Sequence, residues 1–174
     1  PYPALVAWQG GYKQNLSIEQ GRLVASDALY TGWEPNCCPS GVRYRTYELQ
    51  GDQLRVVVER SEGNVEMQAE TVRHFYELIN NRDLETAYTF LSDDFKRAWP
   101  YDKWVAGYAT TVRTDAEVTE DPSAPNTVRI ALTATDRGDD GEEVVRRFTG
   151  TWKLQWAPER PGWILTEPRI QAAP

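Results

Sequence analysis

Hydrophobic and polar residues alternate with a period of two from Gln14 to Glu59. This alternation is typical of antiparallel strands that bury one face. It is interrupted at Gln20-Gly21 and at Gly51-Asp52, and glycine at such positions favours the two-residue turn of a β-hairpin. The pattern therefore predicts two hairpins, joined by an irregular segment at residues 31–41 that holds both cysteines.

Each predicted turn fixes which residues face one another across its hairpin. The pairs expected around the first turn are Glu19 with Arg22 as an ion pair, Ile18 with Leu23, and Leu16 with Ala25. The pairs expected around the second turn are Leu49 with Leu54, Tyr47 with Val56, and Arg45 with Val58. Residues 1–60 are thus predicted to form a small antiparallel β domain or part of one. Because about 60 residues bury little core, we expect this domain to pack on its neighbour or on strands outside the chain.

The spacing of apolar residues becomes helical after Ser61. Asn64 is placed to cap a first helix of about 16 residues, Asp83 a second helix, and Asp102 a short third helix. The apolar stripe of the first helix consists of Val65, Ala69, Val72, Tyr76 and Ile79, with Phe75 beside it. The third helix carries Trp104, Val105 and Tyr108.

Period-two alternation returns from Thr110 in four strands, at about 110–120, 126–136, 143–156 and 162–171. The chain is therefore predicted to be an α+β protein, in which a small antiparallel β unit precedes three helices and a curved four-stranded antiparallel sheet. The second domain is expected at residues 64–174, with residues 61–68 as the linker and the start of the first helix.

Three helices followed by a long curved sheet is the order of the nuclear transport factor 2-like superfamily, a cone-shaped α+β fold. The segments that resemble it are Val72–Asn80, Asp83–Leu91, Trp104–Tyr108, Trp152–Leu154 and Gly162–Leu165, so the resemblance covers roughly residues 64–172. It implies the fold but no particular activity, since the superfamily includes ketosteroid isomerase, polyketide cyclases, dehydratases and noncatalytic modules.

The N-terminal part resembles a β region of bacterial exported proteins, in which Asp-Pro-x-Cys-Cys-Pro precedes Arg-Thr-Tyr-x-Leu. The matching segments are Asn36-Cys37-Cys38-Pro39 and Arg45-Thr46-Tyr47-Glu48-Leu49, while Trp33-Glu34-Pro35 departs from the pattern. The resemblance implies an extracytoplasmic protein, secreted or anchored through a segment not in this chain, with further strands upstream. The start at Pro1, without Met or a targeting segment, likewise suggests a piece of a longer protein.

The two cysteines are adjacent, so they match no C-x-x-C redox or metal spacing. A disulfide between neighbours is geometrically unfavourable, but an exported chain offers these thiols no other internal partner. Free thiols, or partners in sequence outside the chain, are the alternatives. We predict a Cys37–Cys38 disulfide, which would make the loop a rigid exposed knob.

Composition excludes several classes of function. The 174 residues carry 26 acidic and 19 basic side chains, giving a net charge of -7 and a pI near 4.8, so the basic surface needed for nucleic-acid binding is missing. The longest apolar runs span about five residues, far below the roughly 20 that cross a bilayer, and no membrane insertion of this segment is expected. One His, one Met and two Cys cannot assemble a usual zinc site, and neither a metal nor a cofactor is predicted.

Active members of the superfamily use a carboxylate or His base inside the cone. The expected inward residues of the first three C-terminal strands are Val112, Ala116, Val118, Val128, Ile130, Leu132, Val144, Phe148, Trp152, Leu154 and Trp156. Asp115, Glu117 and Glu143 have the opposite parity and face solvent unless a β-bulge reverses it. His74 falls on the polar flank of the first helix, and alternation around Glu167 is ambiguous. No catalytic residue is therefore predicted.

Aromatic residues are the remaining candidates for a site. The residues proposed to line a ligand pocket are Tyr76, Tyr88, Trp99, Trp104, Tyr108 and Trp152, with Phe95 and Phe148 beside them. The rings form either a hydrophobic core or a pocket for an apolar ligand with Tyr and Trp as polar groups. Arg137-Gly138-Asp139 and its acidic neighbours are interpreted as a hairpin turn rather than an integrin or calcium site.

The sequence thus favours a noncatalytic binding or scaffolding module of an exported bacterial protein. The alternative is a small-molecule enzyme of the isomerase, cyclase or dehydratase kind. The expected partners are an apolar small molecule or another protein, with the chain a monomer or a homodimer through its sheet.

Overall fold

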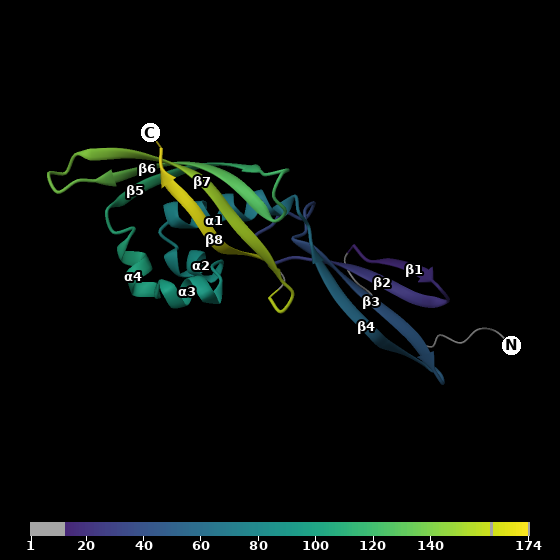
Figure 1. Cartoon of the computed structure of the whole chain (residues 1–174). Coiled ribbons are helices and arrows are strands. Elements are labelled where there is room, and N and C mark those ends of the chain that lie inside the picture. The colour runs from purple at the N-terminus through teal and green to yellow at the C-terminus, as the bar shows by residue number, and fades with distance from the viewer. Residues whose placement is uncertain (1–12, 161, 174) are drawn as a thin grey trace. The chain divides into compact units, whose positions relative to one another are not determined.

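The computed structural model describes residues 13–160 and 162–173, and its chain divides into two compact units (Figure 1). The first unit contains described residues 13–64 together with 157–160 and 162. The second unit contains residues 65–156 and 163–173. Each unit is built around its own four-stranded sheet.

The first unit is an antiparallel sheet of order β1-β2-β3-β4. Its strands are β1 (Asn15–Glu19), β2 (Arg22–Leu29), β3 (Gly41–Gln50) and β4 (Gln53–Gly63). Gln20 and Gly21 have φ values of 51° and 79°, which is the backbone of the tight turn expected between β1 and β2. The predicted register of this hairpin is confirmed at Ile18–Leu23 and Leu16–Ala25.

Two pairings in the first unit differ from expectation. Glu19 lies opposite Arg22, but the Arg22 guanidinium instead contacts Glu48 on β3 at 2.7 Å. The second hairpin has the expected pairs near its turn, yet Arg45 faces Glu59 because the register shifts between Thr46 and Tyr47. The predicted pair of Arg45 with Val58 is therefore wrong, since a bulge changes every partner beyond it.

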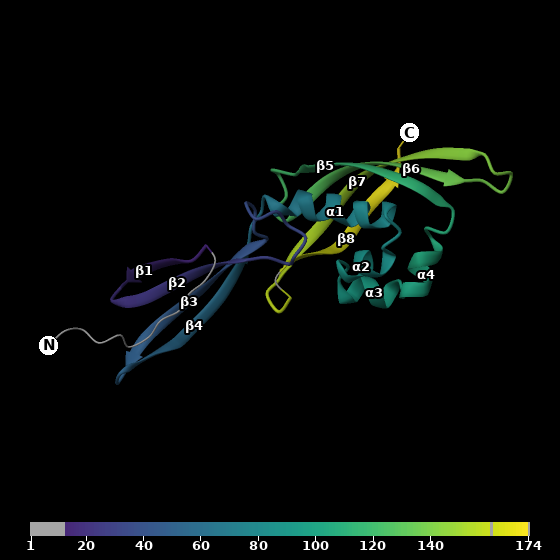
Figure 2. The ribbon, with the colours of Figure 1, turned by 180° about the vertical axis from the view of Figure 1, so that it is seen from behind.

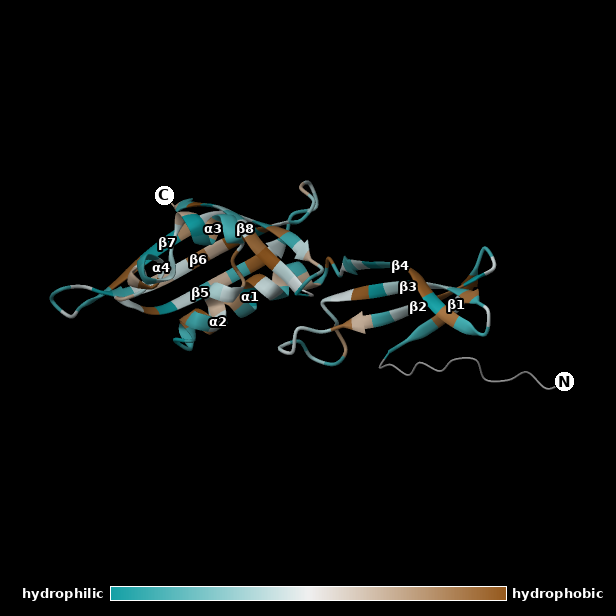
Figure 3. Ribbon diagram, turned by 90° about the horizontal axis from the view of Figure 1, so that it is seen from below, coloured by the Kyte–Doolittle hydropathy of each residue, from teal (hydrophilic) through white to brown (hydrophobic). Residues whose placement is uncertain are grey.

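The apolar face of the first sheet is largely exposed near its two turns. Ile18 is 79% exposed and Leu49 is 62% exposed. Brown hydrophobic bands cross the strands of the first sheet in Figure 3. The buried residues lie toward the opposite end, where Ala25, Asp27 and Leu29 belong to β2. Asp27 is 3.2 Å from the guanidinium of Arg45, which also binds Glu59.

The second unit begins with four helices: α1 (Met67–Asn80), α2 (Leu84–Thr89), α3 (Asp93–Ala98) and α4 (Tyr101–Ala106). Helix α1 starts after Glu66 without a side-chain cap, so the predicted cap at Asn64 is wrong. Asp83 caps α2 as expected by accepting from the amide of Thr86 at 3.2 Å. Helix α3, capped by Ser92, was not predicted, and Asp102 lies in the first turn of α4 rather than at its cap.

The second sheet has the order β5-β6-β7-β8. Its strands are β5 (Thr111–Glu120), β6 (Thr127–Arg137), β7 (Glu143–Ala157) and β8 (Gly162–Ala172). The helices lie against one face of this sheet (Figure 2). The predicted fold class, an α+β chain with a small antiparallel sheet followed by helices on a second antiparallel sheet, is confirmed.

Side chains of α1 and the following turn cover the free edge of β5. The Asn80 amide accepts from the Thr114 backbone N–H at 2.7 Å and donates to its carbonyl at 2.6 Å. Arg73 and Arg82 donate to the carbonyls of Val118 and Thr111. Since an uncovered edge strand can pair with another chain, these contacts disfavour strand addition at β5.

The residues of the second sheet that were expected to face inward are buried at the centre of the sheet but exposed at the starts of β5 and β7. Val118, Val128, Ile130, Trp152 and Leu154 are buried as predicted. Val112 is 39% exposed because the register shifts between Thr111 and Arg113. Val144 is 41% exposed because the β6–β7 hairpin extends past the helices (Figure 1).

Candidate functional site

An aromatic cluster occupies the space between the helices and the inner face of the second sheet. The Phe75 ring on α1 lies 6.2 Å from that of Trp104 on α4 and 6.0 Å from that of Trp152 on β7, measured between centroids. Its neighbour Tyr76 is 5.1 Å away. All four side chains are buried. Phe75 is therefore the centre of the cluster, although its sequence position had placed it only beside the apolar stripe.

A second group of rings surrounds Trp104. Its ring centroid lies 5.4 Å from that of Tyr88 on α2 and 4.9 Å from that of Tyr108, which follows α4. Phe95 on α3 lies 6.1 Å from Trp152. Such tilted and edge-on contacts at 4.5–7 Å are typical of packed aromatic cores, so the cluster joins all four helices to β7.

Five of the six predicted pocket residues take part in this cluster. Tyr76, Trp104 and Trp152 are buried, and Tyr88 and Tyr108 are partly buried. Trp99 is 46% exposed and lies under the Lys103 ammonium, 4.4 Å from its ring centroid. The Tyr88 hydroxyl donates to the Trp99 carbonyl at 2.8 Å, so Trp99 contributes backbone rather than its ring to this region.

Two of the phenols in the cluster, Tyr76 and Tyr108, are the most deeply buried of its hydroxyl groups. The Trp152 indole N–H donates to the Tyr76 hydroxyl at 3.1 Å. Burial, and then the nearby Tyr108, raise the pKa of Tyr76, although the Trp152 hydrogen bond opposes them. Burial raises the pKa of Tyr108 to about 12. Both phenols therefore stay protonated at neutral pH and can donate hydrogen bonds without acting as bases.

The carboxylates of the second unit face away from the cluster. Asp115, Glu117 and Glu143 are exposed as predicted, and Asp115 contacts Arg113 at 2.6 Å. Among the described residues of this unit, the one buried carboxylate is Asp136, which accepts from Thr111 at 2.8 Å and from Arg146 at 2.6 Å. The register shift between Thr111 and Arg113 lies before Asp115, so the acidic side chains of β5 keep the outward parity expected from the sequence.

His74 lies on the flank of α1, as its position in the helix predicts. Its side chain is 22% exposed, and Nδ1 lies 3.5 Å from a carboxylate oxygen of Glu77. The imidazole meets the Phe90 ring edge-on at 5.7 Å. His74 is therefore more enclosed than the expected surface histidine. Glu77 lies on α1 and Phe90 follows α2, and neither belongs to the aromatic cluster.

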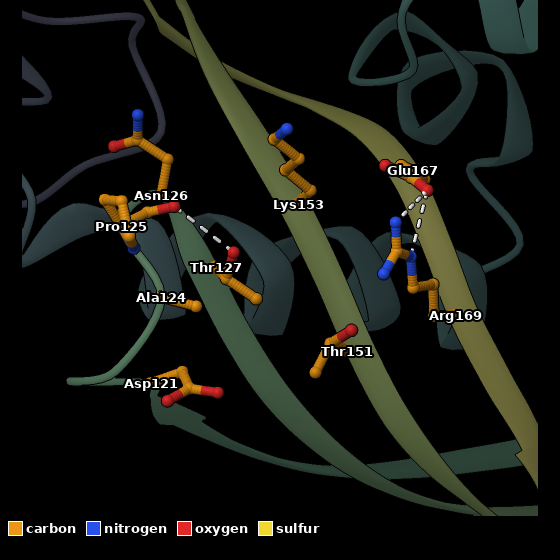
Figure 4. Close-up of a pocket in the computed structure, with 9 residues that line it drawn as sticks. All are labelled: Asp121, Ala124, Pro125, Asn126, Thr127, Thr151, Lys153, Glu167 and Arg169. Carbon is orange, nitrogen blue, oxygen red and sulfur yellow. Dashed lines mark hydrogen bonds and ion pairs between the residues drawn. The ribbon is translucent and has the colours of Figure 1, made fainter.

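A groove of about 630 Å³ lies on the opposite, outer face of the second sheet (Figure 4). It is lined by Asp121, Ala124, Pro125, Asn126, Thr127, Thr151, Lys153, Glu167 and Arg169. Hydrogen bonds from Arg129 and Ser123 lower the pKa of Asp121. A hydrogen bond from Arg169 lowers that of Glu167. Both acids are therefore ionised and paired. Glu167, considered from the sequence as a weak catalytic candidate, lies on this outer face beside Arg169 and outside the aromatic cluster.

The Arg137-Gly138-Asp139 segment belongs to the turn between β6 and β7. Gly138 N–H donates to the Glu142 carbonyl at 2.8 Å, and Gly141 N–H donates to the Gly138 carbonyl at 3.0 Å. Glycine and aspartate therefore have the turn role expected for them. The part of the chain that the structure describes contains no group of three or more potential metal ligands.

In the first unit, the loop between β2 and β3 is built around the buried Glu34 carboxylate. Glu34 accepts from the Thr31 amide at 2.9 Å, the Thr31 hydroxyl at 2.7 Å and the Gly32 amide at 2.9 Å, and also from the Ser40 hydroxyl. Burial by itself raises the pKa of Glu34, but the Ser40 and Thr31 hydrogen bonds outweigh it and lower the value. The loop carries Cys37 and Cys38, which are joined as a disulfide.

Replacing Glu34 with Gln is expected to destabilise the first unit by about 1–3 kcal/mol, because the amide nitrogen that replaces one carboxylate oxygen cannot accept the hydrogen bonds that this oxygen receives. The folded-state pKa of Glu34 is lowered, so its stabilisation is present above the ordinary carboxyl pKa and is lost as pH falls through the folded-state value. The difference in unfolding free energy between parent and Glu34→Gln should therefore shrink on acidification. Glu62→Gln, at an exposed site, should show no such difference.

None of the helices in the described residues is long and apolar enough to cross a membrane. Comparison of the chain with protein-family models, curated proteins and solved structures finds no match. The functional argument therefore depends on the geometry of the two units.

Proposed function

We propose that the chain is a noncatalytic binding or scaffolding module of an exported bacterial protein, with a nuclear transport factor 2-like second unit. The observation that carries this proposal is the aromatic cluster. Enzymes of that superfamily bind their substrates between the helices and the sheet, and here Phe75, Trp104 and Trp152 occupy that space at ring contact distance. A binding function would then use the outer surfaces, such as the groove in Figure 4.

The surroundings of the two buried phenols also support a noncatalytic module. General acid–base catalysis needs a proton acceptor within hydrogen-bond reach of the reacting atom. The described carboxylates of the second unit are exposed or partly exposed, except for Asp136, whose partners are Thr111 and Arg146. Tyr76 is hydrogen-bonded to Trp152, which has no basic atom.

The disulfide loop supports the export of the protein. Disulfides persist in extracytoplasmic, oxidising compartments and are rare in the cytosol. Cys37 is exposed, and Cys38 is partly buried on a loop anchored by Glu34. The sequence resemblance to exported bacterial proteins covers this same loop.

The second candidate is a small-molecule enzyme of the ketosteroid isomerase, polyketide cyclase or dehydratase kind. One observation favours it: the phenols of Tyr76 and Tyr108 both belong to the cluster around Phe75 and Trp104, and both stay protonated. Two such donors could stabilise the developing charge on a carbonyl oxygen. This candidate needs an open pocket beside them and a base within hydrogen-bond reach of the reacting atom.

A titration of the parent protein with 1-anilinonaphthalene-8-sulfonate distinguishes these proposals. Because the cluster fills the interior, any probe fluorescence should come from the exposed apolar residues of the first sheet, such as Ile18 and Leu49. It should therefore not change in Tyr76→Phe or Tyr108→Phe. Saturable binding that Tyr108→Phe or Tyr76→Phe weakens would favour the enzyme. A matched Tyr44→Phe variant, altered on the first sheet, should leave any response unchanged.

A further inference from the structure

We propose that Cys37–Cys38 is a reversible thiol–disulfide exchange site that takes electrons from a dithiol, on a loop that keeps its shape in both redox states. The inference concerns the first unit alone, so it stands independently of what the aromatic cluster does. It rests on how the loop is held, on which cysteine is exposed, and on the charge nearby.

The N-terminal half of the loop is held by bonds that do not involve sulfur. The Glu34 carboxylate accepts hydrogen bonds from Thr31, Gly32 and Ser40. Glu34 and Ser40 are 9% and 1% exposed, so water competes little for these bonds. Because the two residues flank the cysteine pair in sequence, their contact closes the loop without the disulfide.

The backbone next to the cysteines is held as well. The Cys38 amide donates to the Pro35 carbonyl at 3.0 Å, which closes a turn around Asn36 and Cys37. The Tyr30 hydroxyl donates to the Asn36 carbonyl at 2.6 Å. On the other side, Asn64 donates through its backbone amide to the Ser40 carbonyl at 2.7 Å and through its side chain to the Pro39 carbonyl at 3.3 Å. Opening the disulfide breaks none of these bonds.

The two sulfurs differ in access. Cys37 is exposed and Cys38 is partly buried, so an incoming thiolate meets Cys37 first and leaves Cys38 as the departing thiolate. The Lys13 ammonium donates to the Asn36 carbonyl, adjacent to the pair. A cation near a thiolate stabilises it, so Lys13 favours release of the Cys37 thiolate in the second step of the exchange.

The exchange balances as a two-electron reaction. One thiolate of the dithiol attacks the Cys37 sulfur, the bond between Cys37 and Cys38 breaks, and Cys38 leaves with the electron pair and takes a proton from water. The second thiolate of the dithiol then attacks the other dithiol sulfur, which is bonded to Cys37 in the mixed disulfide. This releases the Cys37 thiolate, which is protonated in turn. The dithiol is oxidised to a cyclic disulfide, and Cys37 and Cys38 are reduced to thiols. Oxidised dithiol reverses the sequence.

The chemical part of the test uses the parent protein equilibrated with graded ratios of reduced and oxidised dithiothreitol. Alkylation before reduction should trap no thiol, and alkylation after reduction should trap two. The intact mass of the reduced protein, measured without alkylation, should be higher by two hydrogens. Oxidised dithiothreitol should restore the original mass. Two free thiols that oxidised dithiothreitol fails to close would overturn the proposal, as would a pair that reduced dithiothreitol fails to open.

The structural part of the test compares amide spectra of the ¹⁵N-labelled parent protein in both redox states. Chemical-shift changes should be confined to residues 36–39, with the amides of Thr31, Gly32, Glu34 and Asn64 unchanged. Changes that spread to these amides would show that the disulfide itself holds the loop, which overturns the proposal. Glu34→Gln serves as the control, because it should shift these amides in either redox state, while Cys38→Ser should abolish the exchange.

Discussion

Trp104→Ala is expected to lower the unfolding free energy of the second unit by about 3–5 kcal/mol, the usual cost of truncating a buried aromatic residue. Trp104 is 7% exposed, and its ring contacts Phe75, Tyr88 and Tyr108. Because a domain is stable by only about 5–15 kcal/mol, the melting temperature should fall clearly. Urea unfolding followed by circular dichroism measures the change.

Trp99→Ala is the matched control for this prediction. Trp99 is 46% exposed, so its truncation should change the unfolding free energy by about 1 kcal/mol or less. An unchanged melting temperature in Trp104→Ala, together with saturable probe binding that Tyr108→Phe weakens, would contradict the packed core and favour a pocket.

Gly150→Ala is expected to be the second most damaging substitution. A Cβ atom at this position would collide with the carbonyl oxygen of Arg169 and crowd the Cα atom of Ile170 at 2.7 Å. Both neighbours are backbone atoms of β8, so a side-chain rotation cannot relieve the overlap. Overpacking costs about 1–3 kcal/mol and sometimes more, and here it must push β8 away from β7.

Thermal unfolding and amide exchange of β8 measure this effect. Thr149→Ala is the control, since Thr149 is an exposed neighbour on the same strand, and it should leave both measurements nearly unchanged. Normal protection of β8 amides in Gly150→Ala would show that the strands are not as close as the structure places them.

Sequence reasoning predicted much of the fold because local chemistry determines it. Gln20-Gly21 fixed the first turn and therefore the facing residues Leu16 and Ala25. Asp83 capped a helix because its carboxylate can reach the amide of Thr86. The bulges beside Thr46 and Thr111 were not predictable, because alternation shows only which residues are apolar and not where a strand carries an extra residue.

The candidate site was predictable in composition but not in arrangement. Helical spacing brought Tyr76 inward, yet the central place of Phe75 depends on where α4 and β7 cross α1, which no local pattern encodes. Trp99 was misplaced because α3, capped by Ser92, went unrecognised. The roles of Glu34 and Asn64 were missed because both side chains bind backbone groups that come near only after the loop has folded.

The central claim is that rings and not solvent fill the space between the helices and the second sheet, and hydrogen exchange of the Trp152 indole N–H tests it most directly. This N–H is bonded to the Tyr76 hydroxyl, and Trp152 is 4% exposed. Its resonance can be assigned by its loss in Trp152→Phe. A packed core predicts exchange only through openings that cost nearly the full unfolding free energy of the unit. Exchange as fast as that of an exposed indole would reveal a water-filled pocket and contradict the account.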